Sequence, residues 1–203
     1  MTAATVEQVF GPTIHQISRY IDILRDDGVT RGLIGPRETD RIWERHILNS
    51  VAVTSLVAPD ARVVDVGSGA GLPGIPLAVL RPDLHITLLE PLLRRVNFLS
   101  EVVDALGLGD RVIVVRGRAE EHGERYAAVL ARAVAPLDKL VPWCAPLRSP
   151  VGTVLAFKGR SAAAELSAAQ PALARAKLVA EVLTVRAHAN AEPATVVRLT
   201  PRR

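Results

Sequence analysis

The chain has 203 residues, of which 49% are hydrophobic and 23% charged, a balance that is typical of a globular protein and excludes a disordered one. This length corresponds to one ordinary domain, or to one domain with a small appendage. Lys and Arg number 25 and Asp and Glu 21, so the net charge of +4 permits a nucleic-acid partner without requiring one. The single cysteine, Cys144, excludes an intrachain disulfide and a zinc site built from cysteines, and it favours a cytoplasmic protein.

No export or membrane segment is expected. Residues 1–10 contain Glu7 and lack the basic-then-apolar pattern of an export signal. The apolar run 51–59 is too short to cross a bilayer. We therefore expect a cytoplasmic protein with no membrane partner. We also expect a monomer, because the sequence identifies no surplus apolar surface.

Residues 1–60 show the apolar spacing of helices. A second helix is expected after Pro36, in which Trp43 packs the helices onto the rest of the chain. Arg37, Arg41 and Arg45 are four residues apart and form either a solvated helix face or a stripe that contacts phosphates. The first helix carries an apolar stripe with steps of four and three, made of Phe10, Ile14, Ile17, Ile21 and Leu24.

From residue 61 onward, short apolar strands alternate with helices. The strands are expected at 62–66, 86–89, 112–115, 127–130 and 153–157. Continuously apolar strands are typical of a parallel sheet that helices cover on both faces. Segments 179–185 and 195–199 lie close together in sequence and are expected to pair antiparallel at one edge. The sequence thus predicts an α/β, doubly wound, Rossmann-like domain in residues 61–203, preceded by an N-terminal helical cap in residues 1–60.

A glycine-rich stretch, residues 65–76, reads DVGSGAGLPGIP. It follows a predicted strand and precedes a helical segment, the context in which such a turn binds a nucleotide-like ligand at the carboxyl ends of the strands. Gly69, Gly71 and Gly74 form the pattern G-x-G-x-x-G, and Glu90 ends the next strand, where an acid commonly binds ribose hydroxyls. A tight turn without any ligand is the alternative, but so many glycines would weaken the fold without a reason.

The glycine pattern fits both NAD and S-adenosylmethionine (SAM). Three details favour SAM. Asp65 lies two residues before the first glycine, and Pro73 and Pro76 crowd the helix start, where a pyrophosphate needs free N–H groups. About 60 residues also precede the first strand, whereas a dinucleotide-binding domain often begins near it. An NAD-dependent oxidoreductase stays open, although no proton donor for it can be named.

Residues 65–78, D-V-G-S-G-A-G-L-P-G-I-P-L-A, resemble the first motif of the bacterial RsmG (GidB) family of SAM-dependent 16S rRNA guanine-N7 methyltransferases. The G-L-P-G-I-P extension is far more specific than a general methyltransferase turn. The similarity covers roughly residues 10–200, through Trp43-x-x-His46-x-x-x-Ser50, Arg95-x-x-Phe98-Leu99, Arg118-Ala119-Glu120, Arg132-Ala133 and Phe157-Lys158-Gly159.

The resemblance implies a class I methyltransferase fold, SAM as cofactor, and 16S rRNA or the small ribosomal subunit as partner, with guanosine 527 (rRNA numbering) as the target. Together with the glycine pattern it gives these expected cofactor contacts: Asp65, Gly67, Gly69, Gly71, Leu72, Glu90, Ala119, Glu120 and Arg132. The expected substrate contacts are Lys158, which matches a family position on the substrate side, and two further candidates, His46 and Arg95.

The sequence departs from the family pattern at two places. Many relatives carry Asp-Ser-x-x-Lys after the second strand, where this chain has Glu90-Pro91-Leu92-Leu93-Arg94. Pro91 removes a hydroxyl and an N–H that could contact the cofactor. Relatives also often carry Asn-Leu-Thr between the first two helices, where this chain reads Leu33-Ile34-Gly35. A substrate contact from that loop therefore cannot be carried over.

Guanine N7 bears a lone pair and no proton, so its methylation needs no general base. The reaction is an in-line displacement, to which the enzyme contributes mainly by positioning its two bound partners. A catalytic cysteine, a Ser-His-Asp set or a metal is therefore not expected, and the five histidines show no metal-ligand spacing. Arg132 and Lys158, at the ends of two strands, are the candidates for positioning.

Each of these residues also has a structural alternative. Arg132 could form a structural ion pair, Lys158 could be an ordinary solvated lysine, and His46 could be a hydrogen-bonded interface histidine. If Lys158 contacts the substrate, a phosphate or guanine O6 is favoured, since a bond to N7 would tie up the nucleophile. Trp143 and Cys144 are expected in the core. Two further functions stay open: a class I methyltransferase for another substrate, and a non-catalytic RNA-binding module.

Overall fold

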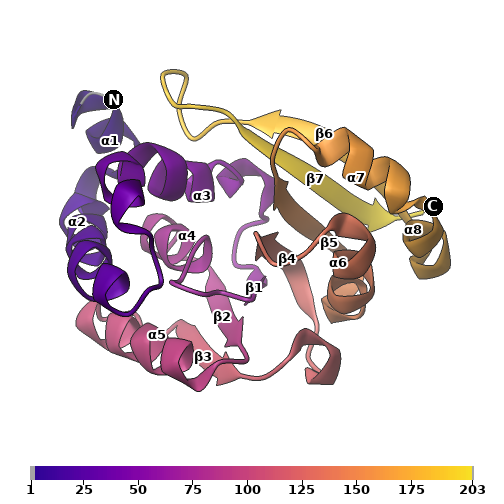
Figure 1. Cartoon of the computed structure of the whole chain (residues 1–203), viewed down its shortest axis with the longest axis horizontal. Coiled ribbons are helices and arrows are strands. Elements are labelled where there is room, and N and C mark those ends of the chain that lie inside the picture. Colours follow the sequence, from indigo (N-terminus) through magenta and orange to yellow (C-terminus); the bar gives the residue numbers. More distant parts are fainter. Residues whose placement is uncertain (1–2, 203) are drawn as a thin grey trace.

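A seven-stranded sheet runs through the molecule in the computed structural model, which describes residues 3–202 (Figure 1). The strand order is β3-β2-β1-β4-β5-β7-β6. Strands β1 to β5 are parallel, whereas β7 runs antiparallel to β5 and β6 antiparallel to β7. This topology confirms the predicted doubly wound sheet with an antiparallel C-terminal edge. The strands are β1 (Arg62–Val66), β2 (His85–Glu90), β3 (Val112–Arg116), β4 (Tyr126–Arg132), β5 (Arg148–Lys158), β6 (Leu178–Val185) and β7 (Ala194–Pro201).

Helices cover both faces of the sheet and enclose two cores. Alternate strand residues point to opposite faces, so Val63 of β1 belongs to one core and Val64 to the other. The first core holds the N-terminal helices together with α4 (Gly74–Leu80) and α5 (Leu93–Ala105). The second core holds α6 (Leu137–Cys144), α7 (Ala162–Ala168) and α8 (Gln170–Ala176).

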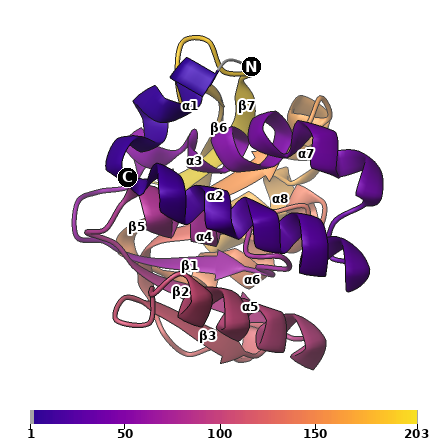
Figure 2. The same ribbon diagram turned by 90° about the vertical axis from the view of Figure 1, so that its left-hand side faces the viewer.

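The N-terminal residues form the predicted helical cap, which lies across α4 and α5 (Figure 2). It contains α1 (Ala3–Phe10) and α2 (Ile14–Ile23), separated by a tight turn at residues 11–13. The predicted apolar stripe is confirmed, because Phe10, Ile17, Ile21 and Leu24 are fully buried and Ile14 is partly buried. The boundary at residue 60 stays a prediction, and Met1, Thr2 and Arg203 lie outside the described residues.

The second predicted helix is not a regular α-helix. It begins as a tight helical segment, Pro36–Arg41, widens over Ile42–Leu48, and becomes α-helical only in α3 (Asn49–Val51). Trp43 packs edge-to-face on Phe10 with ring centroids 6.2 Å apart. Because Phe10 also belongs to the N-terminal helices, the packing of Trp43 onto the rest of the chain stays a prediction. Irregular turns of this kind are frequent at functional sites, and this segment carries several residues described below.

One strand is longer than the sequence predicts. The pattern predicts a strand at 153–157, but β5 begins at Arg148. Pro150 and Gly152 indicate a break in the sequence, whereas in the structure a register shift between Tyr126 and Ala128 of β4 accommodates the extra length. Among residues 3–202, no helix combines the length and apolar character that a membrane span requires.

Candidate functional site

The glycine-rich turn connects β1 to α4 in a conformation that requires glycine. Gly67, Gly69 and Gly71 have positive φ angles of 67°, 59° and 96°. The N–H groups of Gly67 and Ser68 donate to the Leu89 carbonyl at 2.8 and 3.3 Å, which fastens the turn to the end of β2. A Cβ on Gly71 would lie 2.6 Å from Ile75 Cγ1. The turn therefore depends on backbone conformations that favour glycine, and its inner side is closely packed against the protein core.

Asp65, predicted as a cofactor contact, lies beneath this turn. The Gly74 N–H at the start of α4 donates to Asp65 Oδ2 at 2.9 Å, and the Ser68 hydroxyl donates to the Asp65 carbonyl at 2.8 Å. Asp65 is fully buried, and its second carboxylate oxygen has no hydrogen-bond partner among the described residues. Burial raises the pKa of Asp65 to about 7. This carboxyl group thus supports the turn from within the protein.

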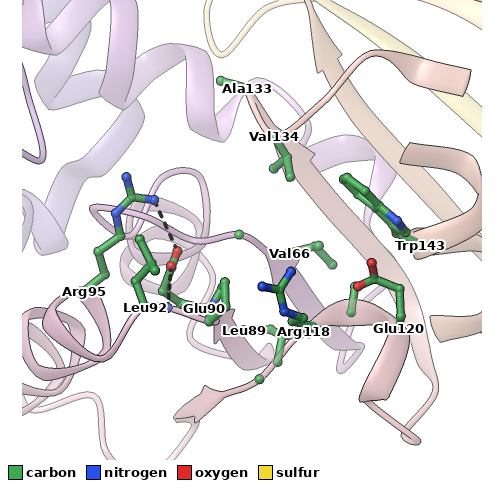
Figure 3. Close-up of a pocket in the computed structure, with 14 residues that line it drawn as sticks. Val66, Leu89, Glu90, Leu92, Arg95, Arg118, Glu120, Ala133, Val134 and Trp143 are labelled. Atoms are coloured by element: carbon green, nitrogen blue, oxygen red, sulfur yellow. Dashed lines mark hydrogen bonds and ion pairs between the residues drawn. The ribbon is translucent and has the colours of Figure 1, made fainter. Parts of the chain in front are cut away.

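A first cavity, of about 380 Å³, opens at the carboxyl ends of β1, β2 and β4 (Figure 3). Glu90 forms part of its wall and is almost fully buried. The two oxygens of its carboxylate each accept one backbone N–H, from Gly69 and from Leu92, both at 3.0 Å. Arg95 lies 3.7 Å from the same carboxylate. Glu90 therefore connects the end of β2 to the glycine-rich turn and still has lone pairs that can accept further hydrogen bonds.

The opposite wall of the first cavity comes from the second half of the chain. Ala119 and Glu120, which follow β3, line it as a pair, and Arg118 lies beside them (Figure 3). Trp143 of α6 also lines it, although the sequence predicts Trp143 in the core. The apolar spacing of α6 could have indicated that Trp143 faces away from the core. The helix buries one stripe, and position 143 falls beside it; the buried residues are Leu137, Leu140, Val141 and Cys144.

A second cavity, of about 350 Å³, lies between the glycine-rich turn and the N-terminal helices. It shares Gly67, Arg95 and Ala133 with the first cavity. The N-terminal part of its wall consists of Leu33–Gly35, Glu38 and His46. The remaining lining residues belong to the turn or follow β4: Ser68, Gly69, Ala70, Leu72 and Arg132.

Arg132, at the end of β4, is held by the N-terminal segment. Its guanidinium donates to Ser50 Oγ at 3.1 Å, to the His46 carbonyl at 3.3 Å and to His46 Nδ1 at 2.5 Å. Among the described residues no carboxylate pairs with it, so the predicted alternative of an ion pair is wrong. Burial lowers the pKa of Arg132.

These bonds define the state of His46. Because a guanidinium only donates hydrogen bonds, His46 Nδ1 must accept, and the proton of a neutral ring then sits on Nε2. Nε2 lies 3.1 Å from Glu38 Oε2 and donates to it. Burial, followed by the nearby charge of Arg132, lowers the pKa of His46. The histidine is therefore a neutral link between Glu38 and Arg132.

Lys158, at the end of β5, fastens the segment that follows β4. Its Nζ donates to the Ala135 carbonyl at 2.6 Å and lies 2.8 Å from Glu165 Oε2. Glu165 Oε2 also accepts the Leu137 N–H at 3.1 Å. The Lys158 side chain is only 9% exposed, so it is not an ordinary solvated lysine. It lines a third cavity, of about 450 Å³, together with Arg132.

The structure brings most of the predicted site residues to these three adjoining cavities. Asp65 and Gly71 line none of the three and lie below the turn. Among the described residues, no cluster of three or more His, Cys, Asp or Glu side chains is arranged to hold a metal ion. The first cavity collects Gly67, Glu90, Arg95, Ala119 and Glu120; the second Gly67, Gly69, Leu72, His46, Arg95 and Arg132; the third Arg132 and Lys158.

A doubly wound sheet with a glycine-rich turn after β1 and a buried acid at the end of β2 is the architecture of class I methyltransferases, and solved structures of that class share this fold. A SAM-dependent methyltransferase from Aquifex aeolicus matches with a TM-score of 0.57 and 16% identity, covering 75% of this chain and 89% of that one. The mitomycin 7-O-methyltransferase MmcR matches with a TM-score of 0.64 and 17% identity, covering 95% and 67%.

Within that class, residues 13–194 match the family described as rRNA small subunit methyltransferase G (GidB). The chain belongs to this family, which confirms the resemblance seen in its motifs. The ribosomal RNA small subunit methyltransferase G of Mycolicibacterium paratuberculosis is 55% identical over 197 residues, covering 93% of this chain and 78% of the relative. That of Streptomyces coelicolor is 57% identical over 170 residues, covering 82% and 71%.

Proposed function

We propose that this protein transfers a methyl group from SAM to N7 of a guanosine in 16S rRNA, at position 527 in rRNA numbering. The names of relatives more than half identical to it support small-subunit rRNA as the substrate. The observation that carries the proposal is the first cavity, where the buried Glu90 carboxylate faces a turn of three left-handed glycines. The same turn and acid would also suit NAD, but the family match over residues 13–194 favours SAM.

The residues of the first two cavities fit SAM. Glu90 uses two backbone N–H groups and keeps acceptor capacity for ribose hydroxyls. Ala119 and Glu120, with Trp143 beside them, would hold the adenine ring in the first cavity. Gly67, Gly69, Leu72 and Arg132 would hold the methionine part in the second cavity.

Glycine at the turn leaves no Cβ between ligand and backbone. Asp65 and Gly71 would act on the cofactor through the shape of the turn, because both lie beneath it. When bound, SAM supplies an electrophilic methyl group on a sulfonium. The remaining task of the chain is to hold the acceptor base in line with that group and to exclude water.

No residue in the site needs to remove a proton, because guanine N7 has none. The state of His46 agrees with this, since both of its ring nitrogens are engaged, one by Arg132 and one by Glu38. We therefore assign His46 a positioning role. The positive charge of Lys158 is balanced by Glu165 at 2.8 Å, which limits repulsion of the cationic methylated base.

Two arginines beside the cavities, the exposed Arg45 and the half-buried Arg95, would supply contacts for RNA phosphates. Arg45 pairs with Glu38 at 3.3 Å, with side chains 50% and 35% exposed. An ion pair this exposed contributes little, so Arg45 can exchange Glu38 for a phosphate at small cost. Arg95 lies at the junction of the first two cavities and is the second candidate. Contacts of this kind make RNA binding fall as salt rises.

The test is transfer of labelled methyl from SAM to small ribosomal subunits that lack the modification, with the label mapped to one nucleotide. Gly69→Arg is expected to abolish SAM binding and labelling, since Gly69 lines the second cavity and a Cβ there would make only an ordinary contact, 3.8 Å, with the Gly67 carbonyl. Gly107→Arg is the matched control, because Gly107 has a similar left-handed φ of 63°, is exposed and has nothing within 4 Å of its Cβ position.

Label at guanine N7 of position 527, lost in Gly69→Arg and kept in Gly107→Arg, would support the proposal. Label at another nucleotide or atom would overturn the assigned target. Absence of both label and SAM binding would overturn the methyltransferase activity itself.

A further inference from the structure

The third cavity lies beside the cofactor side of the molecule. It is lined by Arg45 and Asn49 from the N-terminal segment, by residues 132–136 at the end of β4 and beyond, by residues 157–159 at the end of β5 and beyond, and by Glu165. It shares Ala133 with both other cavities, Val134 with the first and Arg132 with the second. Val134 also packs on the glycine-rich turn, since a Cβ on Gly67 would lie 3.0 Å from it. A base held in this cavity would therefore lie next to the cofactor site.

Four of the five polar or charged side chains that line the third cavity already have partners. Arg45 binds Glu38, Arg132 binds His46 and Ser50, and Lys158 and Glu165 bind each other. Asn49 differs. Its side-chain amide is half-buried and has no partner among the residues that the structure describes.

The fold fixes where this amide lies. Asn49 follows Arg45 by four residues, so both lie on one row of the helical segment, and both line the third cavity. His46 and Ser50 form the neighbouring row and hold Arg132. Asn49 is thus anchored beside the end of β4 and presents an unused donor and an unused acceptor. An amide that lines a cavity and has no protein partner is available to bond solvent or a ligand there.

We propose that the third cavity receives the target guanine, turned out of the RNA, and that Asn49 recognises its Watson–Crick edge. The amide would donate to O6 through Nδ2 and accept the N1–H through Oδ1, which leaves N7 free for the methyl group. Apolar lining from Val134, Pro136 and Phe157 suits the faces of a purine. The volume of about 450 Å³ is in the range of small-molecule sites. This inference rests on the proposed function and adds the residue that selects the base.

The role proposed for Asn49 differs from the role that the sequence predicts for Lys158. The sequence predicts Lys158 as a contact to phosphate or guanine O6, but Nζ already binds the Ala135 carbonyl and Glu165. Lys158 therefore keeps at most one N–H donor for a base or a phosphate, and it has no acceptor for the N1–H of guanine. Asn49 offers both a donor and an acceptor, and neither has a partner among the described residues.

The test compares acceptor bases in wild type and in Asn49→Ala. Small subunits are reconstituted from ligated 16S rRNA that carries guanosine, inosine or 2-aminopurine riboside at the target position. Inosine keeps O6, N1–H and N7, whereas 2-aminopurine keeps N7 but lacks O6 and N1–H. The measurement is kcat/KM for methyl transfer to each substrate, with SAM affinity measured on the same preparations.

Wild type is expected to use inosine nearly as well as guanosine and 2-aminopurine about 10- to 100-fold less well. In Asn49→Ala, kcat/KM for the guanosine substrate is expected to fall about 10- to 100-fold while SAM affinity is retained. The variant should also discriminate less between inosine and 2-aminopurine. Gln170→Ala, which removes an exposed amide on α8, is the matched control and should behave as wild type.

If Asn49→Ala methylates guanosine as wild type does, or keeps the full preference for inosine over 2-aminopurine, the proposal is overturned. If it also loses SAM affinity, the residue is structural and the proposal is equally overturned. A wild-type protein that binds SAM but does not methylate the guanosine subunit would instead refute the proposed function. The two failures are therefore distinguishable.

Discussion

The two sides of the site are built from different materials. The cofactor side is formed by backbone: left-handed glycines, N–H groups donated to Glu90 and Leu89, and a turn so tightly packed that a Cβ on Gly71 would collide with Ile75. The side around Arg132 is formed by side chains: His46 and Ser50 from the N-terminal segment bind the guanidinium at 2.5 and 3.1 Å. The first arrangement depends on steric fit, and the second on the protonation of a histidine.

This difference has a functional consequence. A wall made of backbone offers the same groups to every cofactor molecule, and those groups do not titrate, although Asp65 beneath them does. A side-chain network can exchange partners, which suits a surface that must accept a large RNA. We therefore expect substitutions in the turn to reduce stability and SAM binding together. Substitutions around Arg132 should reduce methyl transfer with a smaller effect on SAM affinity.

The strongest test of the steric part of this comparison is Gly71→Ala. The added Cβ would meet Ile75 at 2.6 Å and Tyr20 Oη at 3.1 Å, at a residue with φ of 96°. Backbone strain and overpacking together predict a loss of about 2–6 kcal/mol in the free energy of unfolding. SAM binding should fall below detection. Denaturant unfolding and titration calorimetry are the measurements.

Gly107→Ala is its matched control. Gly107 also has a left-handed φ, of 63°, but nothing lies within 4 Å of its Cβ position. Gly107→Ala should lose about 1–3 kcal/mol in the free energy of unfolding, from backbone strain alone, and its SAM affinity should be unchanged. Equal effects of the two variants would contradict the conclusion that packing beneath the turn shapes the cofactor side.

The same contrast explains what the sequence could predict. Local signals sufficed for the sheet, the antiparallel edge, the glycine-rich turn and Glu90, since each depends on neighbouring residues. The contacts of Arg132 depend on a residue 86 positions away, His46, and no local pattern encodes that pairing. The helix spacing offered a signal for Trp143, whereas the place of Asn49 was visible only once the third cavity was formed. Asp65 looked like a ligand contact because its buried bond to Gly74 forms only when the turn folds.

A second test concerns the charge beneath the turn. Burial raises the pKa of Asp65 to about 7, so the folded chain keeps a proton that the unfolded chain releases near pH 4. The stabilisation is complete below about pH 4 and is lost as the pH rises through about 7. Asp65→Asn, a neutral isostere, should remove this dependence. As the pH rises from 4 to 8, the free energy of unfolding of the variant should increase relative to that of wild type by on the order of 2–4 kcal/mol.

The measurement is the free energy of unfolding of both proteins across that pH range. Asp83→Asn serves as the control, because the Arg81 guanidinium holds the pKa of Asp83 well below its usual range and this pair lies away from the turn. A wild-type profile that stays flat between pH 4 and pH 8 would contradict a buried, proton-holding Asp65. In that case the neighbours of Asp65 would fully offset the cost of burying its negative charge.

The smallest effect is expected for His46→Asn. This substitution also distinguishes the cofactor side from the side around Arg132 most clearly. Burial and the Arg132 charge lower the pKa of His46, so the ring is neutral at neutral pH and becomes charged only in acid. A charged ring would present an N–H to the Arg132 guanidinium and lose the bond that holds it. Wild-type kcat/KM for methyl transfer should therefore fall as the pH drops below about 6.5.

Asparagine can accept the Arg132 hydrogen bond through Oδ1 without titrating. His46→Asn should keep activity within about tenfold of wild type at neutral pH, because one hydrogen-bond geometry changes, and should lack this acid limb. His122→Asn, which alters a histidine bonded to Tyr126 away from the cavities, should keep the limb. SAM affinity should fall less steeply than kcat/KM as the pH drops, because His46 and Arg132 line the second cavity but not the first. An acid limb that persists in His46→Asn would place the titrating group elsewhere, and an equally steep limb in SAM affinity would place the loss in cofactor binding.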